Sequence, residues 1–185
     1  VLFPFSGGSI VALNAVSGIE EWEINLENSN IGSASASLGD FASDPAVYGS
    51  TIFGVGAFGE TFSATKSGKV LWRNNIQSSS RLIVSGNSAF YSSNNSLIGR
   101  INSKNGKILF LKEFTGKRRV KYVGPLLLQN KLLVLATDKN AYWFSPEDGR
   151  LLNKEKIGKK ISSPPVVVNR RLMFVSEDGM LNILN

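Results

Sequence analysis

The chain has 185 residues, 42% of them hydrophobic and 19% charged, which is the composition of a globular domain and excludes a largely disordered chain. It contains no cysteine and no histidine, so disulfides, thiolate or imidazole metal ligands, and Cys-His or Ser-His-Asp catalytic groups are all excluded. Lys and Arg number 21 against 14 Asp and Glu, and the excess positive charge lies mainly in residues 117–121 and 154–160.

The N-terminal end resembles neither a leader sequence nor a natural start. No apolar run reaches the ~18 residues that a membrane-spanning helix needs, and no signal-peptide pattern opens the chain. The sequence begins with Val1 instead of methionine, in an apolar segment typical of the middle of a strand. We therefore expect an N-terminal part of the protein to lie outside this sequence.

Four turns with similar surroundings recur along the chain. Their glycines are 50, 38 and 43 residues apart and are Gly18, Gly68, Gly106 and Gly149. The residues four positions after these glycines are Trp22, Trp72, Phe110 and Asn153. Ser-Gly, Asn-Gly and Asp-Gly between short apolar runs are typical of β-hairpins, because the turn requires a positive φ.

A second pattern precedes each of these turns. Pro45, Pro125 and Pro165 are each expected to open a short apolar strand, four residues before a turn position at 49, 129 or 169. Arg81 replaces the proline in the remaining copy, ahead of a turn at residues 85–87. A second apolar strand is expected after each of these four turns, at residues 51–55, 88–91, 132–135 and 172–175. Each unit thus has three or four short strands and about 40–45 residues, which is the period of a β-propeller blade.

The predicted fold class is therefore all-β, a β-propeller with about four four-stranded blades in this chain. The expected arrangement is a single partial domain over residues 1–185, with blade units at 1–39, 40–80, 81–120, 121–160 and an incomplete 161–185. Residues 8–14 align without a gap on residues 179–185, so the chain begins inside one blade and stops inside another. Either four blades close into a ring, or the chain is half of a larger ring; the start within a strand favours the second.

Residues 12–22, which contain Ala-Leu-Asn, Ser-Gly and Trp, resemble the PQQ-type propeller repeat, and residues 67–72 are its clearest copy. In such a repeat we expect the aromatic side chain to pack between neighbouring blades. The turn glycine is expected to supply the left-handed φ.

Within that superfamily, the chain resembles the C-terminal half of the BamB outer-membrane assembly lipoproteins. The resemblance lies in residues 38–47, in residues 124–150, and in residues 162–168 followed by 177–179. It implies an eight-bladed ring in the periplasm, held at the outer membrane by a lipid anchor in the absent N-terminal part. It also implies a non-enzymatic scaffold of the β-barrel assembly machinery that binds the periplasmic domains of the barrel-inserting subunit, BamA.

The partner-binding residues that we expect are Leu38, Asp40 and Phe41, in the long connection between residues 26 and 44. In the family, acidic positions of this loop contact the partner, and Asp40 matches one of them. The next acidic position falls on Ala42, where this sequence departs from the pattern. Leu38 and Phe41 either pack on the neighbouring blade or join Asp40 in contacting the partner.

The alternative function is that of a quinoprotein dehydrogenase or a ligand-sensing propeller. We expect no cofactor, no metal and no catalytic residue, because the carboxylates are scattered and the vicinal cysteines common in such dehydrogenases are absent. For the basic residues 117–121, solvated charge is the simplest interpretation; an acidic protein, lipid head groups or nucleic acid are the others. We expect no nucleic-acid partner, and the open ends of a half ring would favour self-association.

Overall fold

The computed structural model describes residues 1–5, 8–26, 43–56, 60–76, 78, 80–93, 96–113 and 120–184. All regular structure in these ranges is β-strand, and they contain no helix. The chain divides into two compact units, Val1–Ala89 with Ile101–Ile108, and Phe90–Arg100 with Leu109–Asn185. The prediction of an all-β chain is confirmed.

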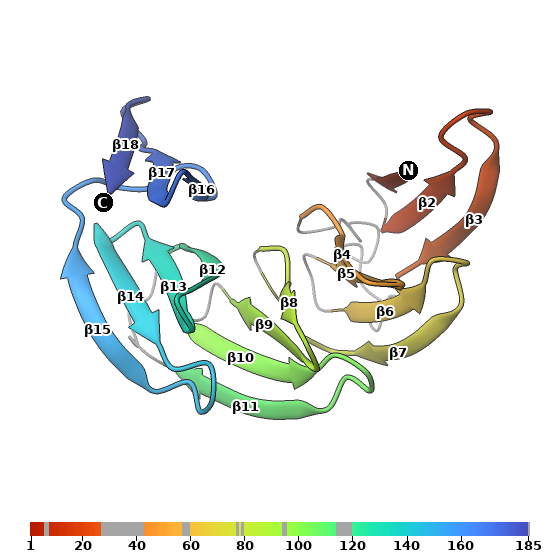
Figure 1. Ribbon diagram of the computed structural model, residues 1–185, viewed down its shortest axis with the longest axis horizontal. Helices are drawn as coiled ribbons and strands as arrows, with labels where there is room; N and C mark the ends of the chain where they lie inside the picture. Colours follow the sequence, from red (N-terminus) through yellow and green to blue (C-terminus); the bar gives the residue numbers. More distant parts are fainter. Residues whose placement is uncertain are drawn as a thin grey trace, which may run out of the picture. The chain divides into compact units, whose positions relative to one another are not determined.

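Each sheet follows the order of its strands along the chain (Figure 1). The first unit holds a three-stranded sheet of β1 (Leu2–Phe5), β2 (Ser9–Leu13) and β3 (Glu20–Asn25), and a four-stranded sheet of β4 (Ala46–Tyr48), β5 (Thr51–Val55), β6 (Thr61–Thr65) and β7 (Val70–Asn74). Another sheet consists of β8 (Ile83–Ser85), β9 (Ser88–Ser92), β10 (Leu97–Asn102) and β11 (Ile108–Glu113), and its residues are divided between the two units.

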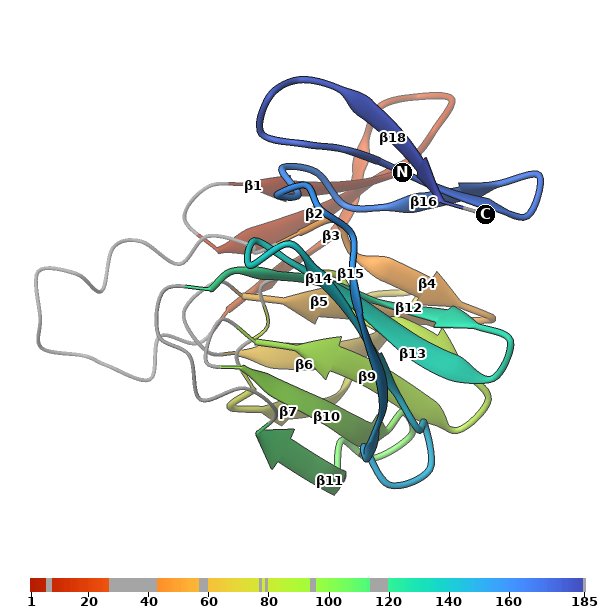
Figure 2. The same ribbon diagram turned by 90° about the vertical axis from the view of Figure 1, so that its left-hand side faces the viewer.

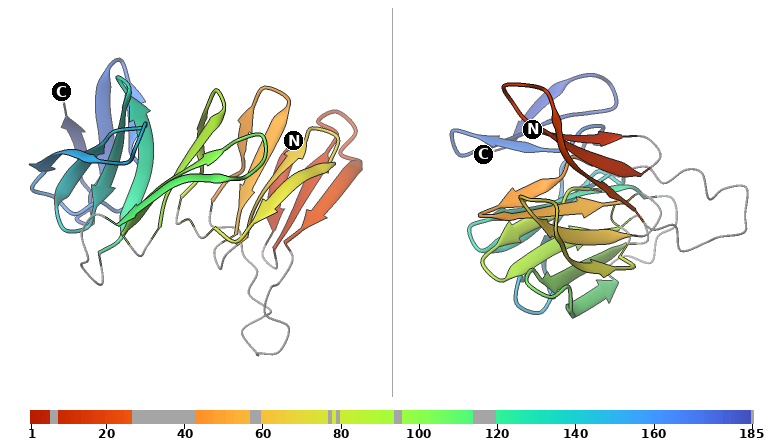
Figure 3. Two further views of the ribbon diagram at one scale, coloured as in Figure 1. Left: turned by 90° about the horizontal axis from the view of Figure 1, so that it is seen from below. Right: turned by 90° about the vertical axis from the view of Figure 1, so that its right-hand side faces the viewer.

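The second unit holds the remaining two sheets. One is four-stranded, with β12 (Tyr122–Leu128), β13 (Lys131–Ala136), β14 (Asn140–Phe144) and β15 (Leu151–Lys156); the other has β16 (Val166–Val168), β17 (Arg171–Val175) and β18 (Leu181–Leu184). Within each sheet, consecutive strands lie side by side (Figure 1, Figure 2 and Figure 3). The unit boundaries set from the repeat, and the number of blades in the whole ring, stay predictions.

The turn glycines have the backbone conformation that the sequence requires. Their φ angles are +69°, +83°, +72° and +72° at Gly18, Gly68, Gly106 and Gly149. The turn before Gly18 is fixed by Asn14, whose Oδ1 accepts hydrogen bonds from the backbone N–H groups of Val16 and Ser17, both at 3.0 Å. Such local side-chain acceptors are the reason that Asn and Ser favour turns.

Each aromatic ring at the repeat position covers the turn glycine of the sheet that follows it in the chain. A methyl group built on Gly68 would lie 2.6 Å from Cγ of Trp22, and one on Gly106 would lie 2.8 Å from Cδ2 of Trp72. The indole N–H of Trp22 also donates to the carbonyl oxygen of Lys66 at 2.8 Å. The expected packing of the aromatic residue between neighbouring sheets is therefore confirmed here.

The same contact recurs in the second unit, where a methyl group on Gly149 would lie 2.5 Å from Cε2 of Phe110. Phenylalanine has no N–H to donate. Instead, Nη1 of Arg100 donates to the carbonyl oxygens of Pro146 and Glu147, both at 3.3 Å. The donor to this turn is thus Arg100 on β10, whereas the donor to the turn before Gly68 is Trp22 on β3, the last strand of its sheet.

At one repeat position the aromatic residue is missing, and a large side chain on the paired strand takes its place. Asn153 on β15 pairs with Trp143 on β14, whereas Trp72 pairs with the small residue Ser63. Trp143 packs against the buried cluster that joins β13 to β17, which includes Leu133, Leu135, Leu172 and Phe174. A large side chain on either of two paired strands therefore fills the space between successive sheets.

One strand differs from its expected bounds. Pro125 was expected to open a strand, but β12 begins three residues earlier, at Tyr122. The register of β12 against β13 shifts between Val123 and Leu126, so that Pro125 lies in the irregular part of the strand. β12 is an edge strand of its sheet, so one side of its backbone has no neighbouring strand to bond. Proline, which lacks an N–H, is tolerated on that free side.

The glycine contact predicts different costs for the same substitution at two equivalent turns. Gly18→Ala places a methyl group at positive φ with nothing within 4 Å, and should lower the free energy of unfolding by about 1–2 kcal/mol. Gly68→Ala has the same backbone cost but also displaces Trp22, which should add about 1–3 kcal/mol. Urea unfolding of the two variants measures the difference, and equal losses would contradict the packing role of the tryptophan.

Candidate functional site

The three predicted partner-binding residues, Leu38, Asp40 and Phe41, lie outside the described residues. The structure does describe both ends of the connection that carries them. β3 ends at Asn25, and β4 begins at Ala46. The connection therefore leads from the last strand of one sheet to the first strand of the next.

The start of this connection is held firmly to the second sheet. Nη2 of Arg73 donates to the carbonyl oxygen of Asn25 at 3.1 Å, and Arg73 also forms an ion pair with Glu60, which is 8% exposed. The side chain of Leu26 packs against the buried cluster of Ile10, Ile24, Phe62 and Ala64. The residues that lead into the expected site are thus fixed by both polar and apolar contacts.

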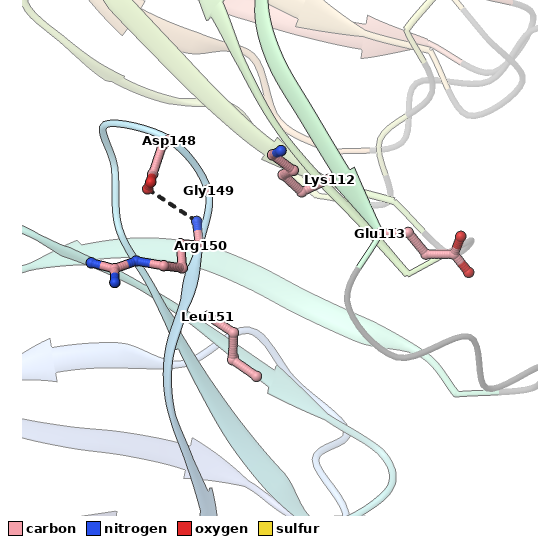
Figure 4. A pocket seen from close by; sticks show the side chains of 6 residues that line it. All are labelled: Lys112, Glu113, Asp148, Gly149, Arg150 and Leu151. Atoms are coloured by element: carbon pink, nitrogen blue, oxygen red, sulfur yellow. Dashed lines mark hydrogen bonds between the residues drawn. The ribbon is translucent and has the colours of Figure 1, made fainter.

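A surface hollow of about 410 Å³ lies in the second unit, between β11 and the turn that precedes β15 (Figure 4). It is lined by Lys112, Glu113, Asp148, Gly149, Arg150 and Leu151. The hydroxyl of Ser145 and the backbone N–H of Arg150 hold the pKa of Asp148 below its usual value. Figure 4 shows that the charged groups of Glu113 and Arg150 point away from each other, so these side chains do not converge on a small ligand.

No sequence pattern predicts this hollow, because its lining comes from β11 of one sheet and from the turn and strand at β15 of another. Elsewhere in the described residues, no group of three or more Asp or Glu side chains could hold a metal ion. Nor do those residues contain a helix of the length and apolar character needed to cross a membrane.

Two ion pairs join the connection after β15 to the turn between β17 and β18. Nζ of Lys159 lies 2.7 Å from Oδ2 of Asp178, and Nζ of Lys160 lies 3.4 Å from Oε2 of Glu177. Asp178 also accepts a hydrogen bond from the hydroxyl of Ser176. The Lys159 ammonium and then the Ser176 hydroxyl lower the pKa of Asp178 to about 2.

Comparison with known proteins decides the family. The family model described as "Outer membrane protein assembly factor BamB" matches residues 1–112.

The chain belongs to this family.

The curated relatives carry the same name. The BamB of Legionella pneumophila (strain Paris) is 25% identical over all of this chain and 48% of its own length, and that of Escherichia coli (strain K12) is 22% identical over 93% of this chain and 44% of its own length. The chain spans about half the length of the curated relatives it matches.

The crystal structure of BamB from Moraxella catarrhalis matches 98% of this chain and 54% of its own, with a TM-score of 0.86 and 17% sequence identity. A likeness at this level of identity shows the fold, which is a β-propeller of PQQ-like repeats. The resemblance to the BamB family and the predicted all-β propeller class are therefore confirmed, and the number of blades stays a prediction. The BamB relatives are named as assembly factors, and none of these names describes an enzyme.

The depressed pKa of Asp178 predicts a titration that depends on Lys159. In the folded protein this carboxyl should titrate near pH 2, so its stabilising effect is complete above its usual pKa of 3.8 and is lost as the pH falls through about 2. Lys159→Met should raise the pKa toward 3.8. Carboxyl NMR titration measures this shift. Lys160→Met is the matched control, because Lys160 pairs with Glu177 and should leave Asp178 unchanged.

Proposed function

We propose that this chain is part of a non-enzymatic scaffold of the outer-membrane β-barrel assembly machinery. Membership of the BamB family, together with curated relatives named as outer membrane protein assembly factors over the whole chain, supports this role. The proposed location is the periplasm, with the complete protein held at the outer membrane by a lipid anchor. No specific observation in the described residues favours a quinoprotein dehydrogenase or a ligand sensor.

The proposed partner is a BamA-like barrel-inserting subunit, bound through its periplasmic domains. Hairpin sheets that pack on one another form a rigid support, and the connections between them are free to carry the contacts. The connection between β3 and β4 suits this purpose, because Arg73 and Leu26 fix its start to the second sheet. A firmly held start lowers the conformational entropy that a binding loop loses when it meets its partner.

Within this connection, we assign the contact to Leu38, Asp40 and Phe41. A carboxylate between two apolar side chains can accept hydrogen bonds from an arginine or from backbone N–H groups, while its neighbours bury apolar area around it. This arrangement keeps water from the charged contact. Truncating an interfacial charge of this kind costs about 2–5 kcal/mol of binding free energy when the charge is desolvated on binding.

The test is the affinity of the full-length protein for the partner's periplasmic domains, measured by calorimetry. Asp40→Arg should weaken binding by at least about tenfold, or about 1.4 kcal/mol, because it reverses the charge at the contact. Glu147→Arg is the control, since it makes the same change of charge at an exposed turn of the second unit. Unchanged affinity of a folded Asp40→Arg variant would remove this loop from the interface.

A further inference from the structure

The two compact units carry very different charges. The first unit has 6 Lys and Arg against 7 Asp and Glu, and the second has 15 against 7. The net positive charge of the protein therefore comes from the second unit. An uneven distribution of this kind attracts anionic partners to one part of a surface.

Backbone hydrogen bonds bring several lysines of the second unit to one end of its four-stranded sheet. The N–H of Thr137 donates to the carbonyl oxygen of Lys121 at 3.0 Å, which places Lys121 beside the end of β13. The N–H of Ile157 donates to the carbonyl oxygen of Lys139 at 2.9 Å, and Lys156 pairs with Asn140. We call Lys121, Lys139 and Lys156 the lysine edge.

The neighbouring carboxylates already have partners. Asp138 accepts hydrogen bonds from the hydroxyl of Tyr142 at 2.5 Å and from the N–H of Asn140 at 3.2 Å. Asp178 and Glu177 are paired with Lys159 and Lys160.

By contrast, the lysine edge has no ion-pair partner within the described ranges, and its three residues are exposed. Glu155 pairs with Ala141, one residue further from this end of the sheet than the pair of Lys156 with Asn140. The charges left available at this end of the sheet are therefore predominantly positive.

We infer that the lysine edge is a second docking surface, and that it binds an acidic, extended segment of a partner polypeptide. Neighbouring strands of a sheet lie about 4.8 Å apart, so the backbones of Lys121 and Lys156, three strands apart, are separated by roughly 14 Å. Carboxylates four residues apart in an extended segment span about 13 Å, which matches this separation.

A polypeptide fits this surface better than a lipid bilayer does. Membrane-docking surfaces combine basic groups with exposed apolar side chains that enter the head-group region. Val120 and Ile157, which adjoin Lys121 and Lys156 in the chain, are only partly exposed. The ion pairs at Asp178 and Glu177 also hold the adjoining turn in place, which suits a specific contact with a peptide. The docking surface is proposed independently of the contact assigned to Asp40.

The experiment uses the full-length protein and a fluorescent 12-residue peptide with glutamate at every fourth position between serine and glycine. Fluorescence anisotropy should show binding that weakens as the salt concentration rises, because salt screens exposed charges. The triple variant Lys121→Glu/Lys139→Glu/Lys156→Glu should bind at least tenfold more weakly at low salt. Lys131→Glu/Arg170→Glu/Arg171→Glu is the matched control, since it makes the same change of charge at exposed residues of the opposite turns. It should retain most of the affinity.

Three results would overturn the inference. The first is that the wild-type protein does not bind the peptide. The second is an equal loss of affinity in both triple variants, which would show a general effect of net charge. The third is sedimentation of the protein with phosphatidylglycerol vesicles, abolished by the lysine-edge substitutions, without binding of the peptide. Circular dichroism and the urea midpoint establish that each variant is folded. If the triple variant does not fold, the single substitution Lys139→Glu, in a surface turn, is measured in its place.

Discussion

The contact of an aromatic ring with the turn glycine of the following sheet is the constraint on which the rest of this structure depends. A single propeller repeat cannot bury its apolar face alone. It becomes stable when its neighbour covers it, as Trp22 covers Gly68 and Phe110 covers Gly149. Only glycine fits beneath these rings, because a methyl group would overlap the ring carbons and the backbone has a positive φ.

The contact tolerates exchange as long as the space between the sheets is filled. Arg100 replaces the indole N–H at the turn before Gly149, and Trp143 provides the bulk that is missing at Asn153. These substitutions explain how repeats with little identity share one backbone. The BamB of Moraxella catarrhalis likewise has this fold at only 17% sequence identity.

Because the sheets are stabilised by contacts along their strands, the connections are available for binding. Residues 26–45 connect β3 to β4, and the lysine edge lies at one end of the sheet formed by β12 to β15. The two proposed surfaces differ in chemistry, because Asp40 lies between Leu38 and Phe41 in the sequence, whereas Lys121, Lys139 and Lys156 carry positive charge.

The sequence by itself determined the strand class, the turns and the family, because hairpin turns depend on local residues: Ser-Gly, Asn-Gly and Asp-Gly require a positive φ wherever they occur. It also placed the aromatic residues four positions after the glycines. Only the tertiary structure decided which glycine each ring covers, that Trp143 compensates for Asn153, and that β12 begins before Pro125. The lysine edge was equally out of reach, since Lys121, Lys139 and Lys156 are far apart in the sequence and meet only because antiparallel pairing aligns the ends of β12, β14 and β15.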